Sequence, residues 1–353
     1  MNSSTSSSDE AMCGQGPIYP QPDGADQGLW LPPGGDLGRQ RLLTDRTALV
    51  LLMFVFAAIA IGLLRTDTRF AGAPKWYWME KLCWGADADV VVAGDSRVYR
   101  GIDPAAFQGA QSIARNFGFS SAKFTREYVE HAASLLSPMG ERVLVLGITP
   151  SSLCRVDVGN NGYQQAQRDL ARLRLPVQLA RAFEEWETLF QPVSVDAGFG
   201  RAGRVRALTD DYVQVFHENG WVESDRIVAD PIANGLAIAR QDFPEGAAPS
   251  LDLQVLLNCV RSLDDRGIRV VGFRPPLPPD VAVLEDALAH LDYSELAEQF
   301  RMAGGSWVNA DSTGLRSYDG SHLDGVSAAE LSKRLAEHIT RERSERRHGS
   351  SSD

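Results

Sequence analysis

The sequence predicts an α/β fold with three layers, α/β/α, around a central, mostly parallel sheet. Three observations predict it: short apolar runs of β-type residues, amphipathic segments between those runs, and small or polar residues where each run ends. Runs that are apolar at every position are typical of parallel strands buried on both faces. Because each crossover returns the chain to the same end of the sheet, the alternation places helices on both faces.

The predicted strands are residues 90–93, 112–116, 143–147, 268–273 and 307–309. Helices are predicted over residues 122–136 and 251–263, where apolar residues recur at helical spacing. The last predicted helix begins at a capping box formed by Ser327 and Glu330 and ends near residue 340. Residues 88–340 therefore form the one main domain that we expect.

Residues 155–249 interrupt the alternation as a long insertion. Helical patterns cover residues 163–173 and 177–189, and a Gly-rich stretch follows over residues 196–203. An insertion near strand ends is commonly a lid or a substrate platform. Structural padding is the alternative, and composition does not distinguish the two.

Both ends of the chain are predicted to lie outside the folded domain. Residues 1–46 are rich in Ser, Gly, Pro and Asp and hold too little apolar surface to offset the entropy of ordering, so we expect a disordered tail. Residues 341–353 are charged and then Ser-rich, and are predicted to be a second tail.

Residues 47–64 carry no charge in eighteen positions and have no polar face. At about 1.5 Å per residue, a helix of this length is roughly 27 Å long, which suits a bilayer core. This predicts one transmembrane helix; a buried core helix or a removable signal peptide are the alternatives. Residues 65–87 are then a juxtamembrane linker whose tryptophans suit a membrane interface.

The net charge of −11 argues against a nucleic-acid partner, because a duplex requires a basic face. The four cysteines, at positions 13, 83, 154 and 259, lack metal-ligand spacing. We therefore predict no metal and no cofactor. The three cysteines after the span allow at most one internal disulfide, or they are small buried apolar side chains.

The residues that suit chemistry lie at one strand end and on one loop. Gly94, Asp95 and Ser96 follow the first strand, where a serine on a tight turn is held clear of the sheet. Asp319 and His322 share a short loop before the last helix. An imidazole beside a serine accepts its proton, and a carboxylate orients the ring. Asp324 is a rival carboxylate for that role.

These two motifs resemble the SGNH, or GDSL-type, hydrolase superfamily, whose first block contains Gly-Asp-Ser and whose last block contains Asp-x-x-His. The resemblance covers roughly residues 88–154 and 250–340. It implies a flavodoxin-like fold in which Ser96 is the nucleophile, His322 the base and Asp319 its orienting residue. Only the first and last blocks are specific.

The resemblance also implies an oxyanion hole made by the N–H groups of Ser96 and Gly118 and by an asparagine of the third block. Here the third block reads Gly-Ile-Thr-Pro-Ser-Ser over residues 147–152, without an asparagine. Ser151, or Ser152 beside it, is the candidate replacement. One lost donor costs about 2.7 to 4 kcal/mol of transition-state stabilisation.

Two arginines are candidate substrate-binding residues. Arg97 follows Ser96 directly, and Arg274 follows the fourth strand in a proline-stiffened loop. The Arg274 guanidinium suits an anionic substrate or an ester carbonyl, and the Arg97 guanidinium suits a developing oxyanion. For each, a plain structural ion pair or solvated side chain is the alternative.

The Pro-containing third block is similar to membrane-anchored SGNH proteins that act in bacterial cell-envelope polymer acylation. That likeness implies a serine esterase or O-acyltransferase acting on an envelope polysaccharide or glycolipid, beside a polytopic acyltransferase. The alternatives are a catalytically silent scaffold subunit and a cytosol-facing lipase. Basic residues are balanced across the predicted span, so the extracytoplasmic placement that we expect depends on this layout.

Overall fold

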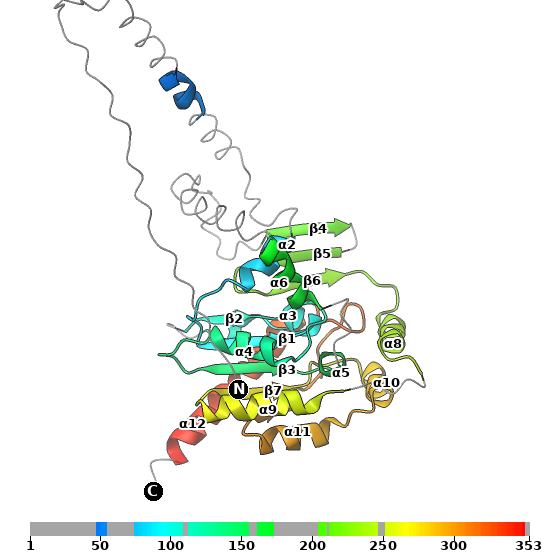
Figure 1. Ribbon diagram of the computed structural model, residues 1–353. Helices are drawn as coiled ribbons and strands as arrows, with labels where there is room; N and C mark the ends of the chain where they lie inside the picture. The colour runs from blue at the N-terminus through cyan, green and yellow to red at the C-terminus, as the bar shows by residue number, and fades with distance from the viewer. Residues whose placement is uncertain are drawn as a thin grey trace, which may run out of the picture. The chain divides into compact units, whose positions relative to one another are not determined.

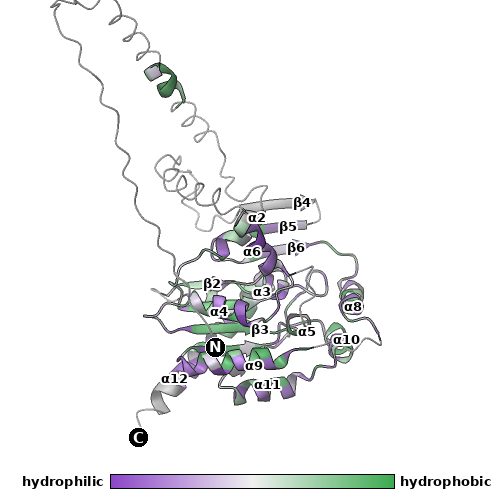
Figure 2. Ribbon diagram, viewed as in Figure 1, coloured by the Kyte–Doolittle hydropathy of each residue, from purple (hydrophilic) through white to green (hydrophobic). Residues whose placement is uncertain are grey.

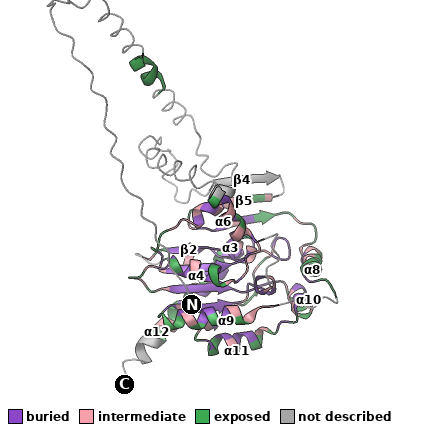
Figure 3. Cartoon of the chain, in the orientation of Figure 1, coloured by how far each residue is buried: buried purple, intermediate pink, exposed green. Residues whose placement is uncertain are grey.

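The computed structural model describes residues 47–54, 74–108, 112–154, 161–172, 204–209, 212–245 and 251–349. The chain divides into two compact units, Met1–Ile59 and Ala60–Asp353. In the first unit, residues 47–54 are helical, and this segment is apolar (Figure 2). Its side chains from Leu49 to Phe54 are exposed (Figure 3). The remainder of the predicted span and the predicted tail 1–46 lie outside the described residues. None of the helices in the described ranges combines the length and the apolar composition of a membrane span.

A five-stranded sheet lies at the centre of the second unit, and all its neighbouring strands are parallel (Figure 1). The order is β2-β1-β3-β7-β8. The strands are β1 Val90–Gly94, β2 Ala114–Asn116, β3 Val143–Gly147, β7 Arg269–Phe273 and β8 Ser306–Val308. All five predicted strands are confirmed. The chain reverses its direction of progress between β1 and β3, and crevices at such a reversal are where open α/β sheets bind ligands.

Helices cover both faces of this sheet, which confirms the α/β class. Alternate side chains of β1 enter two separate cores, because successive residues of a strand point to opposite faces. Val91 and Ala93 pack with α4 Arg126–Ser134, α9 Leu253–Asp265 and α11 Tyr293–Met302. Val90 and Val92 pack with α3 Ser96–Gly101 and α12 Gly325–Gly349. The sheet is accordingly buried on both faces (Figure 3).

The insertion contributes a second sheet, which the sequence analysis did not predict. It is antiparallel, in the order β4-β5-β6, with β4 Arg204–Thr209, β5 Tyr212–Phe216 and β6 Val222–Arg226. In the chain, α5 Pro150–Leu153 and α6 Gly162–Arg172 precede this sheet, and α8 Pro231–Asp242 follows it. Helix α6 confirms the helix predicted over 163–173. The predicted helix at 177–189 and the Gly-rich stretch at 196–203 lie outside the described residues.

Two predicted boundaries of the main domain differ from the structure. Part of the predicted linker 65–87 is α2 Pro74–Lys81, which buries Tyr77, Met79 and Lys81. Trp78 and Trp84, two of the tryptophans expected to suit a membrane interface, pack against the core of the folded domain. At the other end, α12 continues to Gly349, so residues 341–349 of the predicted tail are helical.

The start of α12 also differs in its cap. The N–H of Ser327 donates to Asp324 Oδ1 over 2.7 Å, so Asp324 caps the helix in place of Ser327. The remaining described elements are the short helix Pro104–Phe107 and α10 Pro279–Ala289. Among the described residues, no disulfide joins Cys83, Cys154 and Cys259 to one another.

Candidate active site

The nucleophile turn begins where β1 ends at Gly94. A Cβ on Gly94 would lie 2.7 Å from the carbonyl oxygen of Gly147 on β3, so this close approach of strands requires glycine. Asp95 then caps α3 by accepting the N–H of Arg97 at 3.0 Å. Ser96 is the first residue of α3, at the carboxyl edge of the sheet beside the reversal between β1 and β3.

Residues 316–324 form a tight hairpin, which we call the catalytic hairpin. A bridge between Ser317 and Leu323 closes it, and the N–H of Tyr318 donates to the His322 carbonyl at 3.0 Å. Gly320 at its tip has a φ of 82°, a conformation that favours glycine. The hairpin presents Asp319 and His322 on one short, rigid turn.

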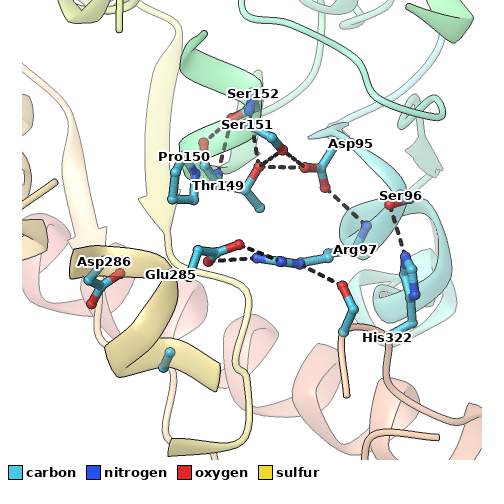
Figure 4. A network of polar contacts seen from close by, with 12 residues as sticks. Asp95, Ser96, Arg97, Thr149, Pro150, Ser151, Ser152, Glu285, Asp286 and His322 are labelled. Carbon is cyan, nitrogen blue, oxygen red and sulfur yellow. Dashed lines mark hydrogen bonds and ion pairs between the residues drawn. The ribbon is translucent and has the colours of Figure 1, made fainter. Parts of the chain in front are cut away.

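The structure brings the three predicted catalytic side chains together. His322 Nε2 lies 2.9 Å from Ser96 Oγ, and His322 Nδ1 lies 2.8 Å from Asp319 Oδ2 (the Ser96 contact is drawn in Figure 4). Asp319 Oδ1 also accepts the N–H groups of Ser321 at 2.9 Å and of His322 at 2.7 Å. Both distances along the relay are within hydrogen-bond reach, which is the geometric requirement for a serine activated by a base.

The pKa of Asp319 indicates which nitrogen of His322 carries a proton. Burial alone would raise the pKa of Asp319, but the hydrogen bond and charge of His322 outweigh it and lower that pKa to about 2. An ionised carboxylate only accepts hydrogen bonds, so the proton of the imidazole is on Nδ1. Nε2 is then the acceptor of the Ser96 hydroxyl proton. This is the arrangement that a general base requires.

His322 is held neutral by its surroundings. Burial lowers its pKa most, and the charges of Arg100 and Arg97 lower it further, against the opposing effect of Asp319. Arg100 NH1 donates to the hydroxyl of Tyr318 at 3.0 Å, and the Tyr318 ring stacks on the His322 ring with centroids 5.9 Å apart. The imidazole therefore has aromatic and cationic neighbours in addition to its carboxylate.

The N–H group of Gly118, the predicted oxyanion donor, is hydrogen-bonded within the fold. Its N–H donates to the Asn116 side-chain oxygen at 2.9 Å, and its carbonyl accepts Lys81 Nζ at 2.9 Å. Asn116 is fully buried and also donates to the carbonyls of Val98 and Ile102. The prediction for Gly118 does not match this geometry, because the Asn116 side chain folds back and takes the N–H group.

Ser151, the other predicted donor, faces a buried carboxylate. Its hydroxyl donates to Asp95 Oδ2 at 3.2 Å, and Thr149 Oγ1 donates to the same oxygen (Figure 4). Ser152, its neighbour, donates its hydroxyl to the carbonyl of Thr149 within the cap of α5. The third block therefore binds the nucleophile turn through Asp95, a residue to which the sequence analysis assigned no role.

The two predicted substrate arginines are both engaged in ion pairs. Arg97 makes a bidentate pair with Glu285, at 3.0 and 2.6 Å, and donates Nε to Ser321 Oγ at 3.1 Å (Figure 4). Arg274 makes a bidentate pair with Asp286, at 2.8 and 2.7 Å. Both guanidinium groups are thus held in ion pairs within the fold.

Arg97 nevertheless connects the two parts of the site. It follows the nucleophile directly, and its contact with Ser321 is one residue from His322. The side chains of Arg97 and Glu285 are only 10% and 2% exposed, so the pair is a buried strut between α3, α10 and the catalytic hairpin. Asp324, the rival carboxylate, pairs with Arg316 and caps α12 rather than orienting His322.

Sequence reasoning missed Asp95, Arg100 and Glu285. The helix-capping position of Asp95 was a readable signal, because an aspartate before a short helix commonly caps it. The ion-pair partner of Arg97 lies 188 positions away, so no local pattern indicates Glu285. Within the described ranges, no group of three or more His, Cys, Asp or Glu side chains is arranged to hold a metal ion.

Comparison with known proteins gives limited information. No protein-family model and no curated protein matches the chain. Among solved structures, the chain is similar to the inhibitor-bound form of an aryl esterase from M. smegmatis, with 12% sequence identity over 72% of this chain and 99% of that chain. The TM-score is 0.30, which is too low for the likeness to carry an argument. The functional conclusion therefore depends on the geometry of the site itself.

Proposed function

We propose that this protein is a serine ester hydrolase or O-acyltransferase with Ser96 as its nucleophile. The observation that carries the proposal is the relay from Ser96 through His322 to Asp319, with distances of 2.9 and 2.8 Å. A serine is a weak nucleophile by itself, and an adjacent oriented base is what activates it. The lowered pKa of Asp319 supports the same roles, because it keeps the orienting carboxylate ionised.

In the proposed reaction, Ser96 Oγ attacks the carbonyl carbon of an acyl ester while His322 Nε2 takes the hydroxyl proton. The tetrahedral intermediate collapses, and His322 returns that proton to the leaving alcohol. Water or a sugar hydroxyl then attacks the acyl-serine while His322 takes its proton. The bond to Ser96 Oγ breaks, and His322 returns the proton to that oxygen, which releases the acid or the acylated sugar. Asp319 stabilises the imidazolium in each step without itself taking a proton.

The substrate and cellular setting belong to the same proposal. We propose an acyl ester of a cell-envelope polysaccharide or glycolipid as substrate, with the chain anchored in the membrane through residues 47–64. The main domain then lies outside the cytoplasm, beside a polytopic acyltransferase that acts as partner. The uncharged stretch at residues 47–64 supports the anchor, and the sequence resemblance supports the substrate class.

The experiment is to measure hydrolysis of a short-chain aryl ester by the purified full chain, with and without an added sugar-hydroxyl acceptor. We expect release of the aryl alcohol by the wild type, and none above background by Ser96→Ala. An acylated sugar product would assign the transferase reaction, and free acid alone would assign the hydrolase. Equal turnover by wild type and Ser96→Ala would exclude Ser96 as the nucleophile.

A second candidate function is favoured by the other side of the site. Gly118 and Ser151, two of the three predicted oxyanion donors, are hydrogen-bonded to Asn116 and Asp95. If these donors are lost, about 10² to 10³ in rate is lost for each. The domain would then serve as a silent polymer-binding or scaffold subunit of an acylation system.

Polymer acylation in cells distinguishes the enzymatic function from the scaffold function. If Ser96→Ala and His322→Ala cells keep a normally acylated polymer while deletion of the gene abolishes acylation, the scaffold function replaces the enzymatic one. If the substitutions abolish acylation as deletion does, the enzymatic function stands. The amount of each variant protein, measured by immunoblot, controls for loss through degradation.

A further inference from the structure

The insertion encloses the catalytic hairpin on two sides. At the base of the hairpin, Arg316 NH2 lies 3.6 Å from Asp225 Oδ2 of β6. At its tip, Asn234 of α8 donates its side-chain N–H to the carbonyl oxygen of Asp319 at 2.6 Å. The hairpin and the insertion are far apart in the chain but meet directly beside the proposed base.

The contact between α8 and the hairpin leaves no room for side chains. A Cβ on Gly235 would lie 2.7 Å from the carbonyl oxygen of Gly320 and 2.9 Å from a methyl carbon of Val281. A Cβ on Gly320 would collide with the backbone of α8 at Pro231 and at Gly235. Backbone therefore packs on backbone at the residue between Asp319 and Ser321, and small movements of α8 displace the hairpin.

Helix α8 is itself held from behind by α10. Val281 of α10 is 1% exposed and touches the Gly235 position, and Glu285 of the same helix pairs with Arg97. Arg97 reaches the hairpin at Ser321. The tip of the hairpin is thus fixed by α8 at Asp319 and Gly320, and by α10 through Arg97 at Ser321.

We propose that α8 positions the catalytic hairpin, and that Asn234 is its principal positioning residue. Asn234 acts through the backbone of Asp319, fixing the carboxylate that orients His322, and does not contact the substrate. The insertion therefore completes the active site instead of only covering it. This inference rests on the proposed serine esterase or acyltransferase function, and its test has one readout that does not depend on turnover.

The test compares Asn234→Ala and the isosteric Asn234→Asp with Gln241→Ala, an exposed position on the same helix. We expect kcat on an aryl ester to fall at least tenfold in Asn234→Ala, and further in Asn234→Asp, where a carboxylate faces the Asp319 carbonyl. We expect KM to stay within twofold, because Asn234 does not touch the substrate. Gln241→Ala keeps the wild-type kcat.

The second readout is the downfield proton resonance of the hydrogen bond between His322 and Asp319, recorded by NMR on the full chain. We expect this resonance in the wild type and in Gln241→Ala, and its shift or broadening in both Asn234 variants at a temperature where each is folded. An unchanged resonance in those variants would overturn the proposal, whether or not the wild type turns over an ester. An inactive wild type with an altered resonance in the variants would overturn only the proposed function.

A glycine pair provides an independent test. Gly235→Ala forces the hairpin or α8 to move, whereas Gly85→Ala adds a Cβ that meets nothing within 4 Å. We expect Gly235→Ala to lower kcat at least tenfold with the resonance altered, and Gly85→Ala to leave both unchanged. Wild-type kcat and resonance in folded Gly235→Ala would contradict a positioning role for α8.

Discussion

On the acid–base side of the site, Ser96, His322 and Asp319 bond to one another, whereas on the opposite side Gly118 and Ser151 bond to Asn116 and Asp95. The first set forms a chain of two hydrogen bonds that ends at the Ser96 hydroxyl. The second set holds the loops after β2 and β3 in place. Two groups of residues that the same resemblance selected thus have different tasks: one suits chemistry and the other stabilises the walls around it.

The difference arises from what each group has nearby. Ser96 is the first residue of a short helix, and its hydroxyl has the His322 imidazole as its side-chain partner. Gly118 and Ser151 each have a buried side chain within reach, and a buried polar group that leaves its partner unsatisfied costs about 1 to 3 kcal/mol. Their hydrogen bonds therefore stabilise the fold. Substitutions on the two sides should therefore differ in their effect on activity.

The largest effect is expected on the acid–base side. Asp319→Asn removes the charge that keeps the Nδ1 proton in place and so favours the wrong tautomer of His322. We expect kcat to fall by about 10⁴-fold with little change in KM. The control is His338→Ala on α12, a histidine paired with Glu342 away from the site, which should retain full activity.

The buried strut should show its importance in stability. Glu285→Gln leaves the guanidinium of Arg97 without its counter-charge in a buried setting, and we expect the free energy of unfolding to fall by about 3 kcal/mol. Chemical denaturation measures it. The matched control is Glu330→Gln, whose exposed i,i+4 pair with Arg334 should contribute less than about 0.5 kcal/mol. Equal losses for both variants would mean that the strut has no special role.

The pH profile tests the surroundings of His322. The base must be neutral to accept a proton, so activity is lost as pH falls through the pKa of His322, which lies below its usual 6.5. Burial and Arg100 lower that pKa. Arg100→Gln removes one of these effects, so the acidic limb of kcat/KM against pH should move to higher pH. An unmoved limb would show that Arg100 does not lower the pKa of His322.

The smallest effect is expected on the opposite side of the site. Ser151→Ala removes a hydroxyl that binds Asp95, and we expect kcat to change by less than about threefold. Were Ser151 the missing oxyanion donor, kcat would fall by about 10² to 10³. Steady-state kinetics on one aryl ester, with wild type and variant assayed together, distinguishes these outcomes.

Much of the fold was predictable because its signals are local. Strands β1, β3 and β7 of the central sheet are apolar at nearly every position, and this pattern can be read in a single sequence. The antiparallel sheet of the insertion was missed: its strands carry charged and polar residues, as in β6 with Glu223, Asp225 and Arg226, and have no continuous apolar run. Helix α2 was mistaken for a linker because its aromatic residues suit a membrane interface as well as a core.

In the site, the motifs predicted that Ser96, His322 and Asp319 would lie in contact. They did not predict which other groups would be hydrogen-bonded within the fold. Ser96 and His322 lie at the ends of elements whose arrangement follows from the fold. The hydrogen bond of the Gly118 N–H group depends on the rotamer of Asn116. The ion pair of Arg97 depends on Glu285, which lies in a helix far away in the sequence. Such pairings depend on tertiary structure, and one sequence does not record them.

Covalent labelling shows whether Ser96 is an activated nucleophile. The full chain is treated with a fluorophosphonate, and the modified peptide is identified by mass spectrometry in wild type, Ser96→Ala and Asp319→Asn. We predict one phosphonylated residue, Ser96, with no label in Ser96→Ala and much slower labelling in Asp319→Asn. Labelling that persists unchanged in Ser96→Ala, or a wild type that takes no label, would contradict the account.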